Sequence, residues 1–158
     1  LYINAERYED AIRVLRIAIE VGDHLGALTN IAVAHMELDQ LKQAEEAYLR
    51  AIEIDPEQWQ VHYNLGNLYW RTNDFPSARD AYRKSVDLNP EDVEARYNLA
   101  ITLVALEQLD DARPLLERLK VELPDNIAVW RELGRIYALN SMIAEAEEAY
   151  ARADDLSQ

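Results

Sequence analysis

The chain repeats its residue pattern every 34 positions, and this period constrains the fold more than any other feature of the sequence. The triplet Tyr-Asn-Leu starts at Tyr63 and again at Tyr97, which are 34 residues apart. The same spacing separates the alanines Ala44, Ala78, Ala112 and Ala146 and the prolines Pro56, Pro90 and Pro124. A period of this length is typical of an array in which each repeat is a small supersecondary unit that packs against its neighbours.

The composition indicates that these repeats are helical. The chain has 158 residues, of which 49% are hydrophobic, so it is long enough and apolar enough to bury a sizeable core. Glu, Ala, Leu and Arg dominate, whereas glycine and proline number only four and five. Because the dominant residues favour helices and the β-branched and aromatic residues are few, the sequence predicts an all-α fold.

The repeat resembles the tetratricopeptide repeat, a helix–turn–helix unit of 34 residues. The small residue that this family has at its eighth position corresponds here to Ala32, Gly66, Ala100 and Gly134. Its alanine at position twenty corresponds to the four alanines above, and its large residue at position twenty-four to Tyr48, Tyr82, Leu116 and Tyr150. The resemblance implies a right-handed superhelical solenoid of antiparallel helix pairs with a concave groove. The expected repeats are 25–58, 59–92, 93–126 and 127–158, preceded by a truncated repeat in residues 1–24 that is mostly a second helix, all in one continuous domain.

Some positions depart from the regular pattern. We expect Asp55 to cap a first helix with Pro56 at the first helical position, and Asn89 and Pro90 to repeat this arrangement. Pro114 falls inside a second helix, and because proline removes a backbone donor we expect that helix to start late or to kink. Position four, which is usually large and apolar, is His62 and Arg96 in two repeats. In the truncated repeat, Tyr2 suits the end of a first helix, and Gly22 and Asp23 stand where a proline is expected.

The predicted binding surface lies on the first helix of each repeat. A rotation of 100° per residue places positions five, nine, twelve and thirteen away from the partner helix, and the resemblance implies that they line the groove, with position six at its edge. The predicted peptide-binding residues are Asn30, Tyr63, Asn64, Asn67, Trp70, Arg71, Tyr97, Asn98, Arg131 and Arg135. The amides can pair with a peptide backbone, the aromatic rings can anchor a partner, and the two C-terminal arginines, one turn apart, can hold a carboxylate.

Other interpretations of these residues stay open. Asparagine at position six is often structural, and the aromatic rings can pack between neighbouring repeats. Arg131 and Arg135 can also be a solvated pair that balances Glu132. Relatives that bind a C-terminal carboxylate carry lysines at groove positions where this chain has Thr29, Val33, Gln60 and Glu94, so we do not predict that ligand.

Charge and motifs exclude several classes of function. The net charge of −14 argues against nucleic acid and anionic membranes, which need clustered basic residues. We find no cysteine, no bilayer-spanning apolar run, and no phosphate loop, HExxH motif or nucleophile elbow. The three histidines are not spaced as ligands, so the sequence predicts neither a metal site nor a cofactor.

We therefore predict a soluble, non-catalytic scaffold that binds a protein or peptide segment, extended or helical, in its concave groove. The compartment stays open between cytoplasm and periplasm. One alternative is assembly of homo-oligomers through uncapped ends, since Ile12, Leu15 and Ile19 are expected to form an uncovered face on the truncated repeat. Another is a regulatory domain of a larger enzyme, because the chain begins at Leu1 and is expected to be part of a longer one.

Overall fold

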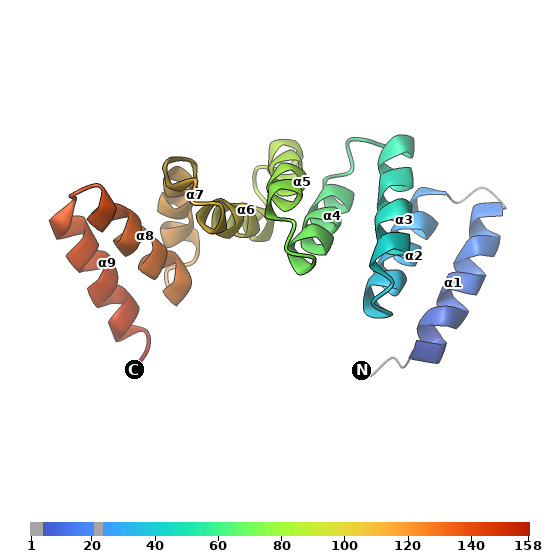
Figure 1. Ribbon diagram of the computed structural model, residues 1–158, viewed down its shortest axis with the longest axis horizontal. Coiled ribbons are helices and arrows are strands. Elements are labelled where there is room, and N and C mark those ends of the chain that lie inside the picture. The colour runs from blue at the N-terminus through green and yellow to red at the C-terminus, as the bar shows by residue number, and fades with distance from the viewer. Residues whose placement is uncertain (1–4, 21–23) are drawn as a thin grey trace. The chain divides into compact units, whose positions relative to one another are not determined.

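The computed structural model describes residues 5–20 and 24–158, and all regular secondary structure in these ranges is helical. The predictions for Tyr2, Gly22 and Asp23 concern residues outside this description. Helices follow one another in the order α1 (Ala5–Glu20), α2 (Leu25–Glu37), α3 (Leu41–Ile54), α4 (Trp59–Arg71), α5 (Phe75–Leu88), α6 (Val93–Ala105), α7 (Leu109–Glu122), α8 (Ile127–Leu139) and α9 (Ile143–Asp155). The predicted all-α architecture of antiparallel helix pairs is confirmed (Figure 1).

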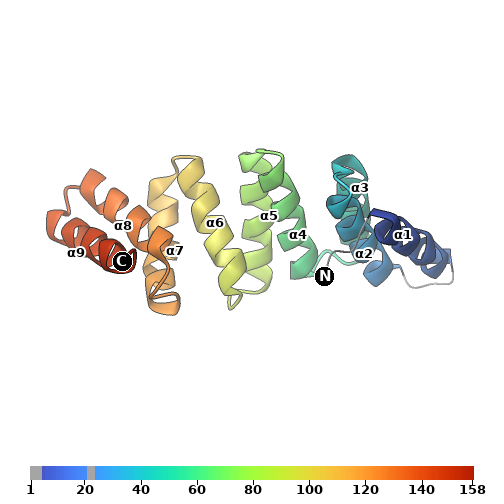
Figure 2. The same ribbon diagram turned by 90° about the horizontal axis from the view of Figure 1, so that it is seen from below.

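The chain divides into two compact lobes, which we describe separately. The N-terminal lobe comprises Leu1–Asn89 and the C-terminal lobe Pro90–Gln158. In the N-terminal lobe α2 packs against α1 and α3, and α4 packs against α3 and α5. In the C-terminal lobe α7 packs against α6 and α8, and α8 packs against α9 (Figure 2).

Small residues allow the two helices of each pair to approach closely. Ala44, Ala78 and Ala112 have no exposed surface, and Ala146 is 5% exposed. Gly66 lies against the ring of Tyr82, where a Cβ would come within 2.5 Å of Cδ1. Around these positions the N-terminal lobe buries large apolar side chains such as Leu28 and Leu65, each of which stabilises the fold by about 1.5–3 kcal/mol.

The turn inside each pair places one residue in the left-handed backbone region. The residues with positive φ are Asp39, Asn73, Glu107 and Ser141, which again are 34 apart, with φ between 57° and 60°. None of them is glycine, although glycine adopts this conformation most easily. Asn73 and Asp39 tolerate it through their short polar side chains, whereas Glu107 and Ser141 hold it at a cost in stability.

Two local predictions were wrong. Asp55 does not cap α4, which begins later, at Trp59. Instead its carboxylate accepts hydrogen bonds from the Glu57 backbone N–H and the Gln58 side chain at 3.0 and 2.8 Å, which shapes the turn before the helix. The following first helix is likewise capped by Asp92 rather than by Asn89, with the Asp92 carboxylate accepting from Ala95 N at 2.7 Å.

Pro114 does not delay its helix. The helix α7 begins at Leu109, in the same register as α5 at Phe75, and contains Pro114 as its sixth residue. Packing against α6 and α8 therefore holds the first turn of α7 in place despite the missing backbone donor.

The apolar face of α1 is largely covered, contrary to prediction. Ile12 is buried, and Leu15 and Ile19 are half-buried against the core of the lobe. The apolar side chains that α1 does expose are Val14 and Ile17, at 65% and 57%. The prediction identified the stripe that α2 covers instead of the stripe beside it.

Position four, which departs from the usual apolar residue, carries a repeated hydrogen bond. His62 Nε2 lies 2.9 Å from the carbonyl of Pro56, and Trp130 Nε1 donates to the carbonyl of Pro124 at 2.8 Å. Arg96 donates to the carbonyl of Pro90 in the same way and also pairs with Glu122. Three chemically different side chains thus satisfy the carbonyl of the proline six residues earlier, and His62 and Arg96 are buried while doing so.

Candidate peptide-binding surface

The ten predicted binding residues all lie on first helices, and none of them is buried. Asn30, Trp70, Arg71 and Arg131 are exposed, whereas Tyr63, Asn64, Asn67, Tyr97, Asn98 and Arg135 are half-buried. The surface belongs to α2 and α4 in the N-terminal lobe and to α6 and α8 in the C-terminal lobe. The helical rotation therefore separated accessible positions from core positions correctly, while the binding role of these residues stays a prediction.

Two amides of the N-terminal lobe have no hydrogen-bond partner among the residues that the structure describes. They are the side chains of Asn30 on α2 and Asn64 on α4, which occupy the same repeat position. By contrast, within the described ranges every buried side-chain nitrogen or oxygen has a partner. An amide that is accessible and unpaired retains its donors and its acceptor for a ligand.

Aromatic rings lie beside these amides. The Tyr63 ring is 6.0 Å from the Tyr82 ring in a tilted arrangement, and the Trp70 ring meets Phe75 edge-on at 5.0 Å. Trp70 nevertheless remains 36% exposed. Rings that are fixed on one side and open on the other lose little entropy when they anchor a partner.

The structure gives two predicted binding residues an internal role. The Tyr82 hydroxyl donates to Asn67 Oδ1 at 2.7 Å, so this amide helps to hold α5 against α4. Arg71 donates from Nη1 to the carbonyl of Met36 and from Nη2 to Asp39, each at 2.8 Å. Arg71 thereby ties the end of α4 to the end of α2, which places these two helix ends next to each other in the N-terminal lobe.

The C-terminal lobe presents a different set of groups. Tyr97 and Asn98 lie half-buried on α6, and the Asn98 backbone carbonyl accepts from the Thr102 hydroxyl at 2.6 Å. On α8, Arg135 Nε donates to Glu132 Oε2 at 2.9 Å. Arg131, one turn earlier, makes no hydrogen bond or ion pair within this lobe, all of whose residues the structure describes.

Hydrogen bonds between adjacent pairs were missed at the sequence level. Tyr69 of α4 donates to Glu45 of α3 at 2.7 Å, and Tyr137 of α8 donates to Glu117 of α7. Burial, followed by the hydrogen bond to Glu45, raises the pKa of the Tyr69 hydroxyl, which therefore stays protonated and continues to donate. The only sequence signal was that both tyrosines occupy position eleven.

Repeated ion pairs were also missed. Arg118 lies 3.2 Å from Glu91, and Arg152 lies 3.1 Å from Asp125, so in both cases a second helix reaches back to the turn before its own repeat. The arginines are 34 residues apart, and so are the acids, which was a visible signal. These pairs account for part of the charge on the turns without any ligand, although exposed pairs of this kind contribute little stability.

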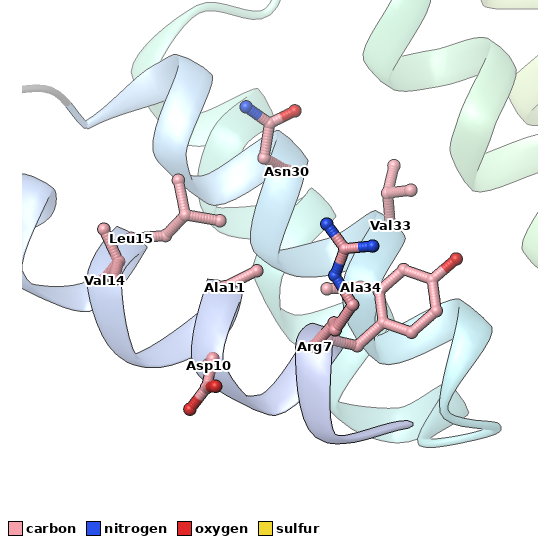
Figure 3. A pocket seen from close by; sticks show the side chains of 9 residues that line it. Arg7, Asp10, Ala11, Val14, Leu15, Asn30, Val33 and Ala34 are labelled. Atoms are coloured by element: carbon pink, nitrogen blue, oxygen red, sulfur yellow. The ribbon is translucent and has the colours of Figure 1, made fainter. Parts of the chain in front are cut away.

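A cavity of about 550 Å³ lies between α1 and α2 (Figure 3). Val14 and Leu15 of α1 face Val33 and Asn30 of α2 across it, and Arg7 lies at its edge. Tyr8 closes one side: burial, followed by the charge of Glu37 and a hydrogen bond to it, raises the pKa of the Tyr8 hydroxyl. The cavity is thus mainly apolar and adjoins one of the two unpaired amides.

Metal and membrane chemistry find no support in the part of the chain that the structure describes. Residues 5–20 and 24–158 contain no group of three or more acidic, histidine or cysteine side chains that could hold a metal ion. His35 lies instead in the core, with Nδ1 2.6 Å from Gln40 Oε1. In the same ranges none of the helices has the length and apolar character needed to cross a bilayer.

An all-helical array of antiparallel pairs with accessible first-helix side chains defines the class of helical-repeat interaction scaffolds. Family models place the chain within that class: a model described as tetratricopeptide repeat matches residues 63–127 and 100–158, and one described as TPR repeat matches residues 33–73. The chain belongs to the tetratricopeptide repeat family, whose members are protein-interaction scaffolds. The resemblance inferred from the sequence is therefore confirmed.

Curated relatives match only about half of the chain. An Hsp70-Hsp90 organising protein from Plasmodium falciparum (isolate 3D7) is 38% identical over 76 residues, which are 48% of this chain and 12% of that protein. Tetratricopeptide repeat protein 37 from Xenopus laevis is 32% identical over 72 residues, 45% of this chain and 5% of that protein. The matched stretches are thus small parts of much longer proteins.

Solved structures confirm the fold over nearly the whole chain. A crystal structure of MamA matches with a TM-score of 0.82 at 19% identity and covers 96% of this chain and 90% of MamA. YrrB, described as a TPR protein with an unusual peptide-binding site, matches with a TM-score of 0.82 at 25% identity over 90% of this chain and 74% of YrrB. The chain therefore has the solenoid fold of these proteins.

Proposed function

We propose that the chain binds a peptide segment of another protein, and that in the N-terminal lobe the segment lies on the surface formed by Asn30, Tyr63, Asn64 and Trp70. The observation that carries this proposal is the pair of accessible, unpaired amides at one repeat position. In a protein whose described buried polar atoms are all satisfied, such amides are free to pair with a peptide backbone. The peptide-binding site of YrrB, 25% identical to this chain, supports the same function.

Several further features belong to this proposal. Each repeat, 25–58, 59–92, 93–126 and 127–158, is one unit of the array, and residues 1–24 are a truncated unit. Binding is non-catalytic, and nucleic acid is not a partner because a chain of net charge −14 repels phosphates. The segment is extended or helical, and the compartment stays open.

The test begins with a defined probe. A synthetic library of short peptides is passed over the folded protein, and retained peptides are identified by mass spectrometry and resynthesised. Isothermal titration then measures each Kd with the wild type and with the double variant Asn30→Ala, Asn64→Ala. We expect the double variant to bind about tenfold more weakly, since each lost hydrogen bond contributes about 0.5–1.5 kcal/mol.

A matched control separates this surface from the rest of the molecule. Gln43 is an exposed amide on the second helix α3, so Gln43→Ala removes a similar group elsewhere. Affinity should be unchanged in this variant, and circular dichroism should show native helicity in both. Equal binding by the wild type and the double variant would refute the proposed surface.

A second copy of the chain is the other candidate partner, since Leu139 and Ile143 expose 65% and 59% of their surface at the turn between α8 and α9. Sedimentation equilibrium over a range of concentrations tests it. A rising mass that Leu139→Ser abolishes would favour self-assembly, and a constant monomer mass would exclude it.

A further inference from the structure

The basic residues of the C-terminal lobe are nearly all neutralised by acids of the same lobe. The lobe contains fifteen acidic and seven basic residues, and the structure describes all of them. Arg96 and Arg118 pair with Glu122, Lys120 pairs with Glu117 at 2.7 Å, and Arg113 acts on Glu117 through its charge. The remaining pairs are those of Arg135 with Glu132 and Arg152 with Asp125.

Arg131 is the exception among the basic residues of this lobe. It is exposed on α8 and has no acid partner, although acids outnumber bases about two to one around it. Its neighbour one turn later is Arg135, so two like charges share one helical face, an arrangement that destabilises an isolated helix slightly. Only Nε of Arg135 is engaged by Glu132, which leaves one carboxylate for two guanidinium groups.

From this arrangement we infer that Arg131, supported by Arg135, binds a carboxylate of the partner peptide. The inference rests on the proposed function, because it assumes that the partner is a peptide, and it adds the chemistry that the C-terminal lobe selects. A guanidinium group presents parallel N–H donors that match the two oxygens of a carboxylate. An unpaired guanidinium group in an acid-rich lobe also attracts the one class of anion that the lobe itself does not supply at this place.

Apolar groups extend the same face toward the end of α8. Ala138 and Leu139 are exposed, and Leu139 lies one turn after Arg135. Arg131 and Leu139 are separated by about 12 Å along the helix axis, from eight residues at 1.5 Å each. Because an extended chain advances about 3.3 Å per residue, the preferred segment carries a large apolar side chain three to four residues from its carboxylate.

The experiment uses the same synthetic peptide library in two forms, one with amidated C-termini and one with free C-terminal carboxylates. Both are selected on the whole chain as wild type, Arg131→Gln and Arg131→Lys. We expect the wild type to enrich peptides that combine a carboxylate with an apolar residue at this spacing, and Arg131→Gln to lose this enrichment. Arg131→Lys should retain it only in part, since lysine keeps the charge but not the paired donors.

Titration of one selected peptide gives the magnitude. Replacing its acidic residue by the amide should weaken binding to the wild type about tenfold and leave binding to Arg131→Gln nearly unchanged, since hydrogen bonds between charged groups contribute more than neutral ones. The control is Arg83→Gln, which removes another exposed arginine without an ion-pair partner, from α5 of the other lobe. If Arg83→Gln has the same effect as Arg131→Gln, general electrostatic attraction explains the binding and the inference is wrong.

The two library forms identify the source of the carboxylate. Enrichment with amidated peptides assigns an Asp or Glu side chain, and enrichment only with free ends assigns the C-terminus. Peptides that are enriched without any preference for a carboxylate, and that depend on Asn30 and Asn64, would overturn this inference while supporting the proposed function. If no peptide is retained in either form, the proposed function fails, and this inference fails with it.

Discussion

The pairs α4–α5 and α6–α7 have the same backbone register but solve their packing differently. In the first pair Gly66 lies under the ring of Tyr82, whereas in the second the equivalent positions are Ala100 and Leu116, both fully buried. A residue with no side chain meets a large ring in one pair, and a methyl group meets a smaller aliphatic side chain in the other. The repeat therefore conserves the space between two helices rather than a residue at either position, and its positions have to be considered in pairs.

The largest expected difference between the two pairs concerns their buried polar groups. Arg96 of α6 is 1% exposed and depends on Glu122 of α7, whereas α4 has His62 there and α5 has Leu88 in place of the acid. Glu122→Gln should lower the free energy of unfolding by about 3–5 kcal/mol, because it leaves a buried charge without its partner. Urea denaturation followed by circular dichroism measures the change.

A transplant sharpens this prediction. The double variant Arg96→His, Glu122→Leu copies the arrangement of α4–α5 and should regain most of the lost stability. Glu91→Gln, which removes an exposed partner of Arg118, should change stability by less than about 1 kcal/mol. A loss from Glu122→Gln no larger than that from Glu91→Gln would contradict the importance of the buried pair.

The second difference is the proline inside α7. Asp80 is the residue of α5 that corresponds to Pro114. Asp80→Pro should destabilise the chain by about 3 kcal/mol, since it removes a helical hydrogen bond in a pair that has no compensation for its loss. Asp80→Ala controls for the exposed ion pair with Arg79, and thermal unfolding supplies the comparison. A shift in Tm no larger than that of Asp80→Ala would show that this turn of the helix tolerates proline in both pairs.

The third difference is the contact between glycine and tyrosine. Gly66→Ala should cost about 1–3 kcal/mol, because the added methyl would overlap the buried Tyr82 ring, and Tyr82→Leu in the same chain should restore stability. Gly134→Ala is a milder case, since the Tyr150 ring it would contact is 41% exposed and can move away. Urea denaturation of the three variants decides the matter, and additive effects of Gly66→Ala and Tyr82→Leu would contradict the pairing.

The smallest expected difference lies in the turns. Asn73 and Glu107 adopt the same left-handed backbone with φ near 60°, but only asparagine tolerates it well. Glu107→Asn should raise the free energy of unfolding by about 0.5 kcal/mol, with Glu107→Gly a little above or below that value. The matched change Asn73→Glu should lower it by a similar amount, and opposite signs for the two substitutions are the result to look for in urea denaturation.

Much of the fold was predictable because the period is a property of the backbone. The antiparallel helix pairs, the close approach at Ala44 and Gly66, and the accessible face of the first helices follow from spacing and helical rotation alone. The ends of first helices were less predictable. The turn before α4 is shaped by Asp55 bonding to its own neighbours, and such local hydrogen bonds compete with helix capping for the same residue types.

The candidate site was predictable in position but not in pairing. Exposure of Asn67 and Arg71 follows from their place on α4, yet their partners Tyr82 and Asp39 come from other helices and turns. Which accessible polar group meets an internal partner depends on side-chain conformations that the period does not determine. For the same reason the sequence could not show that Arg131 lacks an acid partner while Arg135 has one.

The hydrogen bond from position four to the proline carbonyl has a consequence for how such a chain can change over generations. His62, Arg96 and Trp130 make this bond with unrelated ring systems and charges. Their codons are nevertheless neighbours, since single-nucleotide changes convert histidine to arginine and arginine to tryptophan. A gene encoding such an array can therefore move between all three donors without passing through a residue that leaves the carbonyl unsatisfied, so that mutation can diversify the position while selection sees one constant bond.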